Sequence, residues 1–448
     1  MKRCLVVIVF AVLSLDTFSQ QGSELAPTPP MGWNSWDSYG LTVTEAEFKS
    51  NVDWLHQHLQ KFGWQYVVVD EGWYLTRPEN ASKQGGDQGY VVSADGLYQP
   101  ATNRFPSSAN GQGMKPLADY VHSLGLKFGI HIIRGIPKQA VEKDLPIAGS
   151  TFRASEAADQ SDLCRWNPDN YGVKDNAAGQ AYYDSLARLY ASWGLDFLKV
   201  DCISQPYDAH EIHMISAALK KSGRPIVLSL SPGPTPLDQA ADVRQYAQMW
   251  RISDDMWDIW AKKPGDEAFP QSLKNQFGLV RAWSPYVEPG HWPDADMLPI
   301  GYLGPRPGWG EARQSRFTLG DTRTLLTFWA IARSPLILGT NLTRMDPQIE
   351  AMVTNPEVIA VDQHSTGNRP VSVTPETVIW TAFDGSNRLA AVFNLGDSPA
   401  NITQLWTALG LDRSSYRVRD LWLREELGTQ SQLRVSVPPH GAFLFSLR

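Results

Sequence analysis

The stretch Leu198–Ser204, LKVDCIS, combines an apolar strand with a charged end. Successive side chains of a strand point to opposite faces, so Leu198 and Val200 share one face while Lys199 and Asp201 share the other. The apolar face suits packing against helices, and the base and the acid suit a polar interior. The stretch therefore predicts a buried strand that presents functional groups at its carboxyl end.

Seven other runs between residues 30 and 345 follow the same plan. Each is a short apolar or β-branched run with a polar end, followed by a longer stretch with helical spacing, such as residues 42–63. Eight alternations of strand and helix predict a (β/α)8 TIM barrel with helices around a parallel sheet. The expected strands are Met31–Trp36, Tyr66–Asp70, Lys127–Ile132, Asp196–Asp201, Ile226–Ser231, Met249–Ser253, His291–Met297 and Leu336–Asn341.

The pattern changes near residue 368. Residues 371–396 and 432–448 contain short alternating strands separated by Asp-Gly, Pro-Pro and Gly turns, without helical stretches between them. The sequence therefore predicts a barrel over residues 20–367 and a C-terminal antiparallel β-sandwich domain over residues 368–448. Packing on the barrel is the favoured role of this domain, and glycan binding is the alternative.

The N-terminus carries Lys2 and Arg3 and then an apolar run to about Leu15. This predicts a secretory signal peptide over residues 1–19, because the run is too short to span a membrane. We expect a secreted or periplasmic protein. Cys4 would leave with the signal, and the even pair Cys164 and Cys202 would then favour one disulfide in an oxidising compartment.

Charge and composition narrow the range of partners. The net charge of -7 is mild and no long basic run is present, so nucleic acid and anionic membranes are not expected partners, and a small neutral substrate fits better. The 17 tryptophans suit stacking on sugar rings, although large aromatic cores use them equally well. The oligomeric state stays open.

Polar residues at the strand ends indicate the chemistry. The chain has no His or Cys cluster with metal spacing, no Gly-rich nucleotide loop and no Gly-x-Ser-x-Gly elbow, so no metal or cofactor is expected. A pair of carboxylates in an open cup is the equipment for cleaving a glycosidic bond. Asp201, with Lys199 on the same face, suits the ionised role. Asp255 or Asp254 suits the protonated role, because crowded like charges raise one pKa.

Seven motifs resemble glycoside hydrolase family 27, the melibiase-type α-galactosidases and α-N-acetylgalactosaminidases. They occur in order along the barrel, and the resemblance extends into the C-terminal β-domain. The motifs are PPMGWNSWDSYG (29–40), YVVVDEGW (66–73), LKFGIHI (126–132), LDFLKVDC (195–202), WRISDDMW (250–257), WPDADML (292–298) and FWAIARSPLILGTNL (328–342).

The resemblance implies a retaining double displacement. The nucleophile position matches Asp201, and the acid/base position, four residues after Arg251, matches Asp255 rather than Asp254. A disulfide beside the fourth strand is also a family feature and agrees with Cys164 and Cys202. The implied sugar contacts are a stacking Trp33 and polar partners at Asp70, Glu71, Lys199, Arg251 and Asp296.

Three departures from the family pattern leave the sugar open. Glu71 replaces the usual Asp where the pocket meets O4 and O6, His131 replaces the usual Tyr, and Ser231 replaces a carboxylate facing the 2-hydroxyl. We expect hydrolysis of terminal α-D-galactosides of oligosaccharides or polysaccharide side chains. β-L-Arabinopyranosidase and α-N-acetylgalactosaminidase activities are the enzymatic alternatives, and an inactive carbohydrate-binding barrel is the non-enzymatic one.

Overall fold

The computed structural model describes residues 25–82, 86–263, 265, 269–304 and 311–448. The expected signal peptide and Cys4 lie outside these residues. Eight parallel strands are hydrogen-bonded in the order β10-β9-β8-β7-β3-β2-β1-β13. Leu298, just after β10, bridges to Leu338 of β13 and brings the two ends of the sheet together. The strands are β1 (Met31–Asn34), β2 (Tyr66–Val69), β3 (Lys127–Ile133), β7 (Phe197–Asp201), β8 (Val227–Leu230), β9 (Met249–Arg251), β10 (Trp292–Asp294) and β13 (Leu336–Leu338).

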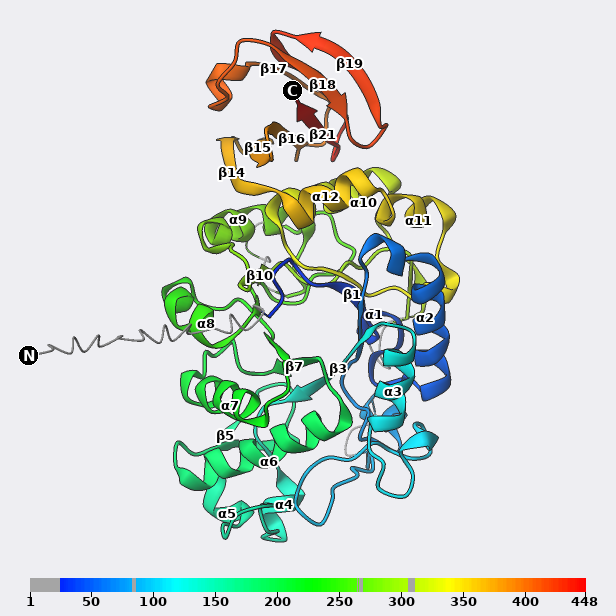
Figure 1. The fold of residues 1–448 in the computed structure, drawn as a ribbon, viewed down its shortest axis with the longest axis vertical. Helices are drawn as coiled ribbons and strands as arrows, with labels where there is room; N and C mark the ends of the chain where they lie inside the picture. Colours follow the sequence, from blue (N-terminus) through cyan, green and yellow to red (C-terminus); the bar gives the residue numbers. More distant parts are fainter. Residues whose placement is uncertain (1–24, 83–85, 264, 266–268, 305–310) are drawn as a thin grey trace, which may run out of the picture.

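Helices surround this sheet, and the predicted (β/α)8 barrel is confirmed (Figure 1). Thr44 caps α2 through a capping box with Glu47, and Gly194 ends α6 in the left-handed conformation, as the sequence pattern predicts. The helices are α1 (Trp36–Tyr39), α2 (Glu45–His58), α3 (Lys115–Ser123), α4 (Lys138–Glu142), α5 (Ala154–Ala157), α6 (Ala177–Trp193), α7 (Ala209–Ser222), α8 (Ala240–Tyr246), α9 (Leu273–Trp283), α10 (Leu319–Ala332), α11 (Pro347–Val353) and α12 (Pro356–His364).

The two-residue period of the strands separates two cores. Leu198 and Val200 of β7 belong to the large cluster between strands and helices, whereas Phe197 of the same strand belongs to the cluster inside the barrel. Lys199 follows Phe197 on the inner face and lines a small cavity there, so the inner row of β7 turns polar toward its carboxyl end. The same change along neighbouring strands places the polar groups together at one end of the barrel.

A three-stranded antiparallel sheet interrupts the barrel pattern between β3 and α6. It consists of β4 (Ile136–Pro137), β5 (Ala158–Leu163) and β6 (Asn170–Val173) in the order β4-β6-β5. The sequence pattern did not predict it. Cys164 follows β5 directly and forms a disulfide with Cys202, with Cα atoms 5.9 Å apart, so the pairing expected from the sequence is confirmed.

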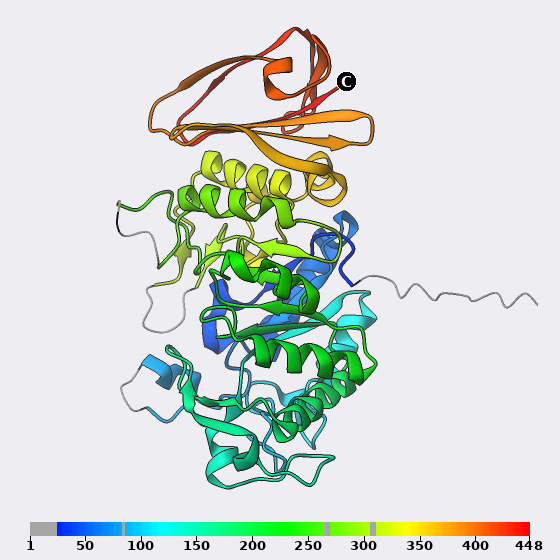
Figure 2. The ribbon, with the colours of Figure 1, turned by 90° about the vertical axis from the view of Figure 1, so that its left-hand side faces the viewer.

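The C-terminal domain is antiparallel and packs on the barrel (Figure 2). Phe328 of α10 contacts Trp380 and Phe393 of this domain, and Phe277 of α9 also contacts Phe393, so barrel and sandwich share one apolar cluster. A six-stranded sheet, β14-β15-β16-β21-β18-β19, and the pair β17-β20 make up the domain. The strands are β14 (Thr366–Val373), β15 (Thr377–Asp384), β16 (Asn387–Asn394), β17 (Ala400–Leu405), β18 (Tyr416–Asp420), β19 (Glu425–Gln430), β20 (Gln432–Val437) and β21 (Ala442–Leu447).

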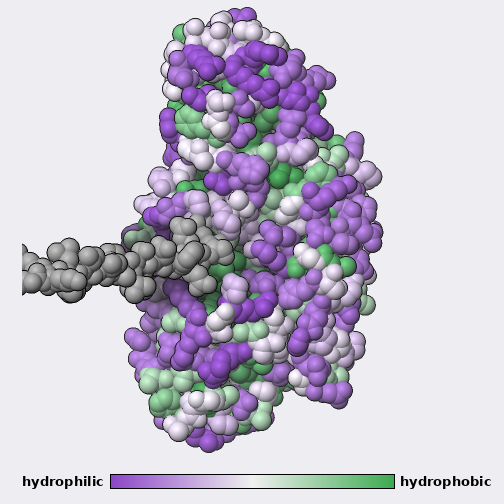
Figure 3. Space-filling view, in the orientation of Figure 1, coloured by the Kyte–Doolittle hydropathy of each residue, from purple (hydrophilic) through white to green (hydrophobic). Residues whose placement is uncertain are grey.

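The surface is polar with scattered apolar residues. On the face drawn in Figure 3, hydrophilic residues dominate and hydrophobic residues lie between them in small patches. Within the described ranges, none of the helices combines the length and the apolar character needed to cross a membrane. After β10, β11 (Tyr302–Leu303) pairs with β12 (Arg313–Gln314) in a two-stranded antiparallel sheet.

Candidate active site

Asp201, the expected nucleophile, ends β7 with its carboxylate held from two sides. The backbone N–H of Cys202 donates to Asp201 Oδ1 over 2.6 Å, and His131 Nε2 lies 3.4 Å from Asp201 Oδ2. Burial by itself raises the pKa of Asp201, but His131, Lys199 and the Cys202 N–H outweigh it and hold the pKa below its usual range. The carboxylate is therefore ionised at neutral pH.

Lys199 binds Asp70 rather than the expected nucleophile. Its Nζ donates to Asp70 Oδ2 over 2.9 Å, and Asn34 Nδ2 donates to the same oxygen over 2.7 Å. Burial opposes both charges, yet their mutual attraction lowers the pKa of Asp70 and, together with Asp201, raises the pKa of Lys199. The strand period, which puts Lys199 and Asp201 on one face, predicts that Lys199 holds the pKa of Asp201 low. In the structure His131 is the larger of the two stabilising influences on Asp201.

Arg251, Asp255 and Asp296 form a second polar group beyond β8. Arg251 Nη2 donates to Asp296 Oδ2 over 2.7 Å and to Asp255 Oδ1 over 3.2 Å. The side chain of Asp255 is 35% exposed, whereas those of Arg251 and Asp296 are 2% exposed. Asp255 thus offers a carboxyl to the open side while the other two are fixed beneath it.

Burial and neighbouring carboxylates raise the pKa values of two carboxyls in and beside this second group. Burial raises the pKa of Asp296, Arg251 works against that rise, and the charges of Asp255 and Asp294 add to it. Burial also raises the pKa of Asp254, with the neighbouring Asp255 as the next contribution. Crowding, which the sequence argument invoked, therefore acts at Asp254 and Asp296.

Ser231 lies between the two polar groups, because β8 separates β7 from β9 in the sheet. Its backbone N–H donates to the carbonyl of Val200 over 2.8 Å, and the residue is buried. The expected site residues on β7, β8 and β9 therefore come together on neighbouring strands.

Glu71 is fixed by a residue that sequence reasoning missed. Asn167 Nδ2 donates to Glu71 Oε1 over 2.7 Å, and both side chains are buried. The two residues are 96 positions apart, and no motif singles out Asn167. Asn34 was also missed, although it alternates with Gly32 on the inner face of β1 and could have been read from the strand period.

The expectation that Trp33 stacks on a sugar is not supported. Trp33 is 0% exposed, its ring packs against Tyr39 and Phe48, and its Nε1 donates to the carbonyl of Thr340 over 2.7 Å. Its side chain belongs to the cluster between strands and helices, on the face of β1 opposite to Asn34. Trp36, at the start of α1, is the half-buried tryptophan of this motif.

Asp37 is a further buried carboxyl near the site. Burial raises its pKa well above the usual range, the charge of Asp296 adds to this, and Lys199 opposes it. Its Oδ2 has no hydrogen-bond partner among the described residues. Burial and the neighbouring carboxylates therefore favour the neutral form of Asp37.

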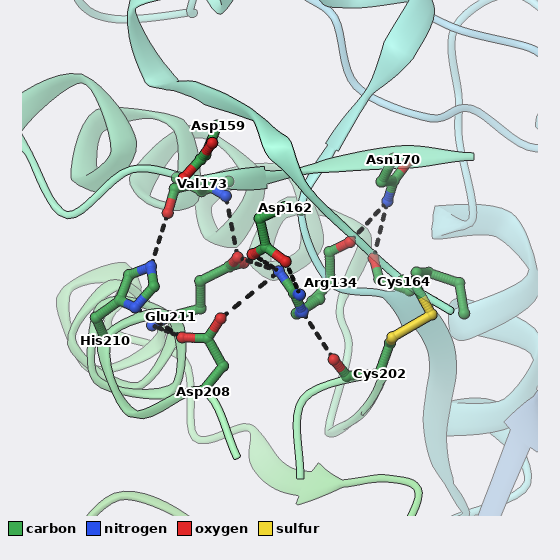
Figure 4. A network of polar contacts seen from close by, with 12 residues as sticks. Arg134, Asp159, Asp162, Cys164, Asn170, Val173, Cys202, Asp208, His210 and Glu211 are labelled. Atoms are coloured by element: carbon green, nitrogen blue, oxygen red, sulfur yellow. Dashed lines mark hydrogen bonds and ion pairs between the residues drawn. A yellow bond between two sulfur atoms is a disulfide. The ribbon is translucent and has the colours of Figure 1, made fainter. Parts of the chain in front are cut away.

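One group in the described part of the chain has metal-ligand spacing: Asp208, His210 and Glu211. The guanidinium of Arg134 forms ion pairs with two of these carboxylates, with Nη1 2.6 Å from Glu211 Oε1 and 3.6 Å from Asp208 Oδ2 (Figure 4). Arg134 also donates through its backbone N–H to the carbonyl of Asp201 over 3.0 Å. This network therefore fixes the backbone at the end of β7, where Asp201 lies.

The chain is similar to known proteins over almost its whole length. A family model described as α-galactosidase A matches residues 170–364, and one described as the α-galactosidase C-terminal β-sandwich domain matches residues 374–447. A family 27 β-L-arabinopyranosidase from Geobacillus stearothermophilus, solved in complex with arabinose, is 44% identical, with 94% of this chain and 97% of that chain covered and a TM-score of 0.89.

Curated relatives extend the similarity to plants and other bacteria. The α-galactosidase of Oryza sativa subsp. japonica is 29% identical, with 94% of this chain and 85% of the relative covered. α-Galactosidase A of Cellvibrio japonicus is 26% identical, with 97% of this chain and 96% of the relative covered.

Proposed function

Because the chain belongs to glycoside hydrolase family 27, we propose that it removes terminal sugars of the galacto configuration from oligosaccharides or polysaccharide side chains with retention of configuration. The chain is a glycoside hydrolase. The observation that carries the proposed mechanism is the position of two carboxyls with different properties. Asp201, which is ionised, ends β7, and Asp255, whose side chain is 35% exposed, follows β9, with only β8 between the two strands.

In the first step, Asp201 attacks the anomeric carbon while the carboxylic acid of Asp255 gives its proton to the departing glycosidic oxygen. The bond to the leaving group breaks as the bond to Asp201 forms. In the second step, Asp255 takes a proton from water, and the water oxygen displaces Asp201 from the sugar. Each carboxyl then returns to its starting protonation state.

The remaining polar residues suit binding of the sugar hydroxyls. Lys199 and Asp70 form one charged pair, and Arg251 and Asp296 form another, so each member is already oriented before a substrate arrives. Preorganised charges of this kind cost little reorganisation when the sugar binds.

Glu71 favours β-L-arabinopyranose over α-D-galactose as the bound sugar. β-L-Arabinopyranose is galactose without the C6 hydroxymethyl group, and Glu71 is one methylene longer than the Asp usual at the end of the pocket that meets O4 and O6. Asn167 holds Glu71 in place, so its extra length takes up space. The 44% identity to a β-L-arabinopyranosidase points the same way.

α-D-Galactoside hydrolysis is the second candidate. The curated relatives named above are α-galactosidases, at 26% and 29% identity. Both sugars share the configuration at C2, C3 and C4, so one set of hydroxyl contacts serves both.

Hydrolysis of three nitrophenyl glycosides side by side tests the assignment: β-L-arabinopyranoside, α-D-galactoside and α-N-acetyl-D-galactosaminide. We expect kcat/KM to be highest for the arabinopyranoside, followed by the galactoside. Highest turnover of the N-acetylgalactosaminide would contradict the role given to Glu71. No turnover of any of the three by folded protein would support the carbohydrate-binding alternative.

We also propose export through cleavage of residues 1–19, on the basis of the charged and apolar pattern at the N-terminus. N-terminal sequencing of protein made in its native host should find a mature chain that starts close to residue 20. An intact Met1 would contradict export by this route.

A further inference from the structure

A short segment beside the site is fastened to the barrel at two points near the nucleophile. We call residues 162–167 the rim segment. Arg134 donates through Nη1 and Nη2 to the two carboxylate oxygens of Asp162, each over 2.7 Å. Two residues later, Cys164 is joined by the disulfide to Cys202 (Figure 4). The beginning of the rim segment is therefore tied to the residue that follows Asp201.

A third contact fastens the end of the rim segment to the opposite part of the pocket. Asn167 binds Glu71 over 2.7 Å, as described above. Glu71 lies two residues after the end of β2, whereas Cys202 directly follows β7. The rim segment thus spans from one lining strand to another, and its conformation is set by contacts at three of its six positions.

Trp166 stands between the last two of these contacts and is open to solvent. It is 46% exposed, and among the described residues it is the one tryptophan in the exposed class. No ring partner or hydrogen bond is found for its indole within the described ranges. The other tryptophans of the described residues are buried or half-buried, so the exposure of this large aromatic side chain on a fastened segment is unusual.

Chain geometry keeps Trp166 close to the reacting groups. The Cα atoms of Cys164 and Cys202 are 5.9 Å apart, and two further residues add at most about 8 Å of chain. Its Cα therefore lies within about 14 Å of the Cα of Cys202, next to the nucleophile. The disulfide at Cys164 and the contact of Asn167 with Glu71 therefore keep Trp166 at the edge of the pocket between Asp201 and Glu71.

We propose that Trp166 is a stacking platform for the leaving-group sugar, the ring on the far side of the bond that is cleaved. This assignment rests on the proposed function. The flat apolar face of indole packs on the C–H face of a pyranose ring. The three contacts of the rim segment fix the backbone around Trp166, so little backbone entropy is lost when a sugar binds to the indole. The platform would favour glycosides whose leaving group is itself a sugar over glycosides with a small leaving group.

Two substrates with the same terminal sugar separate this role from binding in the pocket. Raffinose carries a disaccharide leaving group, and α-D-galactosyl fluoride carries a leaving group too small to reach Trp166. If the arabinopyranoside is the better substrate, a β-L-arabinopyranosyl disaccharide and the corresponding fluoride replace them. For Trp166→Ala we expect kcat/KM to fall about tenfold on the sugar-linked substrate and less than about twofold on the fluoride.

Two control variants and one inhibitor complete the experiment. Leu163→Ala removes an equally exposed side chain, also 46%, from the other side of Cys164 and should change neither substrate. Trp166→Phe should keep most of the activity on the sugar-linked substrate, and inhibition by the free monosaccharide should not change in any variant.

The role of Trp166 and the proposed function fail in different ways. Equal losses on both substrates, or no loss on either, would overturn the platform. If the wild-type protein hydrolyses neither substrate, the proposed function fails rather than the role of Trp166.

Discussion

His131 is the residue that most directly sustains the charge of Asp201. It lies 3.4 Å from the carboxylate and stabilises the ionised form against burial. Lys199, two residues away in sequence, is engaged with Asp70 instead. A residue on the adjacent strand β3 thus matters more for the charge of Asp201 than the nearest charged residue along β7.

Replacing His131 should shift the acid limb of the pH profile. Asp201 must be ionised to attack, so activity is lost as pH falls through its pKa, which stands below its usual range. In His131→Phe that pKa rises, and the acid limb of kcat/KM moves to higher pH. In His131→Tyr, which adds a hydroxyl donor to the ring of the Phe variant, the acid limb should lie between those of the wild type and His131→Phe. An acid limb unchanged in His131→Phe would contradict the role of His131.

Glu71 should set the ratio of the two sugars. Glu71→Asp removes one methylene and makes room for the C6 hydroxymethyl group. We expect the ratio of kcat/KM for α-D-galactoside over β-L-arabinopyranoside to rise on the order of tenfold. Asn167→Ala, which frees Glu71 without shortening it, should lower both activities together. A ratio that Glu71→Asp leaves unchanged would show that the sugar is selected elsewhere.

The site residues differ in how far they can be predicted from sequence. Asp201 and Lys199 can be placed on the inner face of β7 from the strand period alone. The same period places Trp33 on the outer face, since it alternates with Gly32 and Asn34, so the stacking role taken from the family resemblance was wrong on local evidence. The contact between Asn167 and Glu71 could not be predicted, because it depends on how a long excursion folds back.

At the scale of elements, strands with an apolar run are predictable and the others are not. All eight barrel strands lie within or overlap the predicted runs, because burial on both faces demands continuous apolar residues. Strand β5, Ala158–Leu163, reads ADQSDL and is largely exposed, so hydrophobic pattern cannot reveal it. This polar strand nevertheless carries Asp162 and leads into Cys164, and so supports the rim segment.

The network behind β7 should make stability depend on pH. Burial raises the pKa of Glu211 to about 7, with Arg134 opposing the rise. A folded pKa above the unfolded value means that the folded state holds the proton more tightly. Its stabilising contribution is therefore complete below about pH 4.5 and is lost as pH rises through about 7.

Glu211→Gln tests this dependence, because Gln cannot titrate. Relative to the variant, the wild type should lose about 3 kcal/mol of unfolding free energy between pH 4.5 and 8. Urea unfolding of both proteins at several pH values measures it. A difference between the two proteins that is constant across this range would show that Glu211 does not titrate there.

At the scale of the whole molecule, the C-terminal domain is part of the barrel's fold. Phe328 and Phe277 bury their rings against Trp380 and Phe393, and Arg419 adds a bidentate ion pair to Glu357 of α12. The sequence predicted two domains from a change of period, but it could not show that they share a core, because that depends on which apolar faces meet.

Deleting residues 366–448 should therefore produce insoluble protein, since the outer face of α10 would be left uncovered. The soluble fraction after expression, compared with that of the full chain, measures this. A soluble truncated protein that keeps its activity on nitrophenyl substrates but binds polymers more weakly would instead identify the domain as a glycan-binding module.

A proton NMR time course of nitrophenyl β-L-arabinopyranoside hydrolysis distinguishes a double displacement through Asp201 from every other route. We expect β-L-arabinopyranose to be the first sugar released, before it mutarotates, and Asp201→Asn to release none. First release of the α anomer, or full activity of Asp201→Asn, would contradict a double displacement through Asp201.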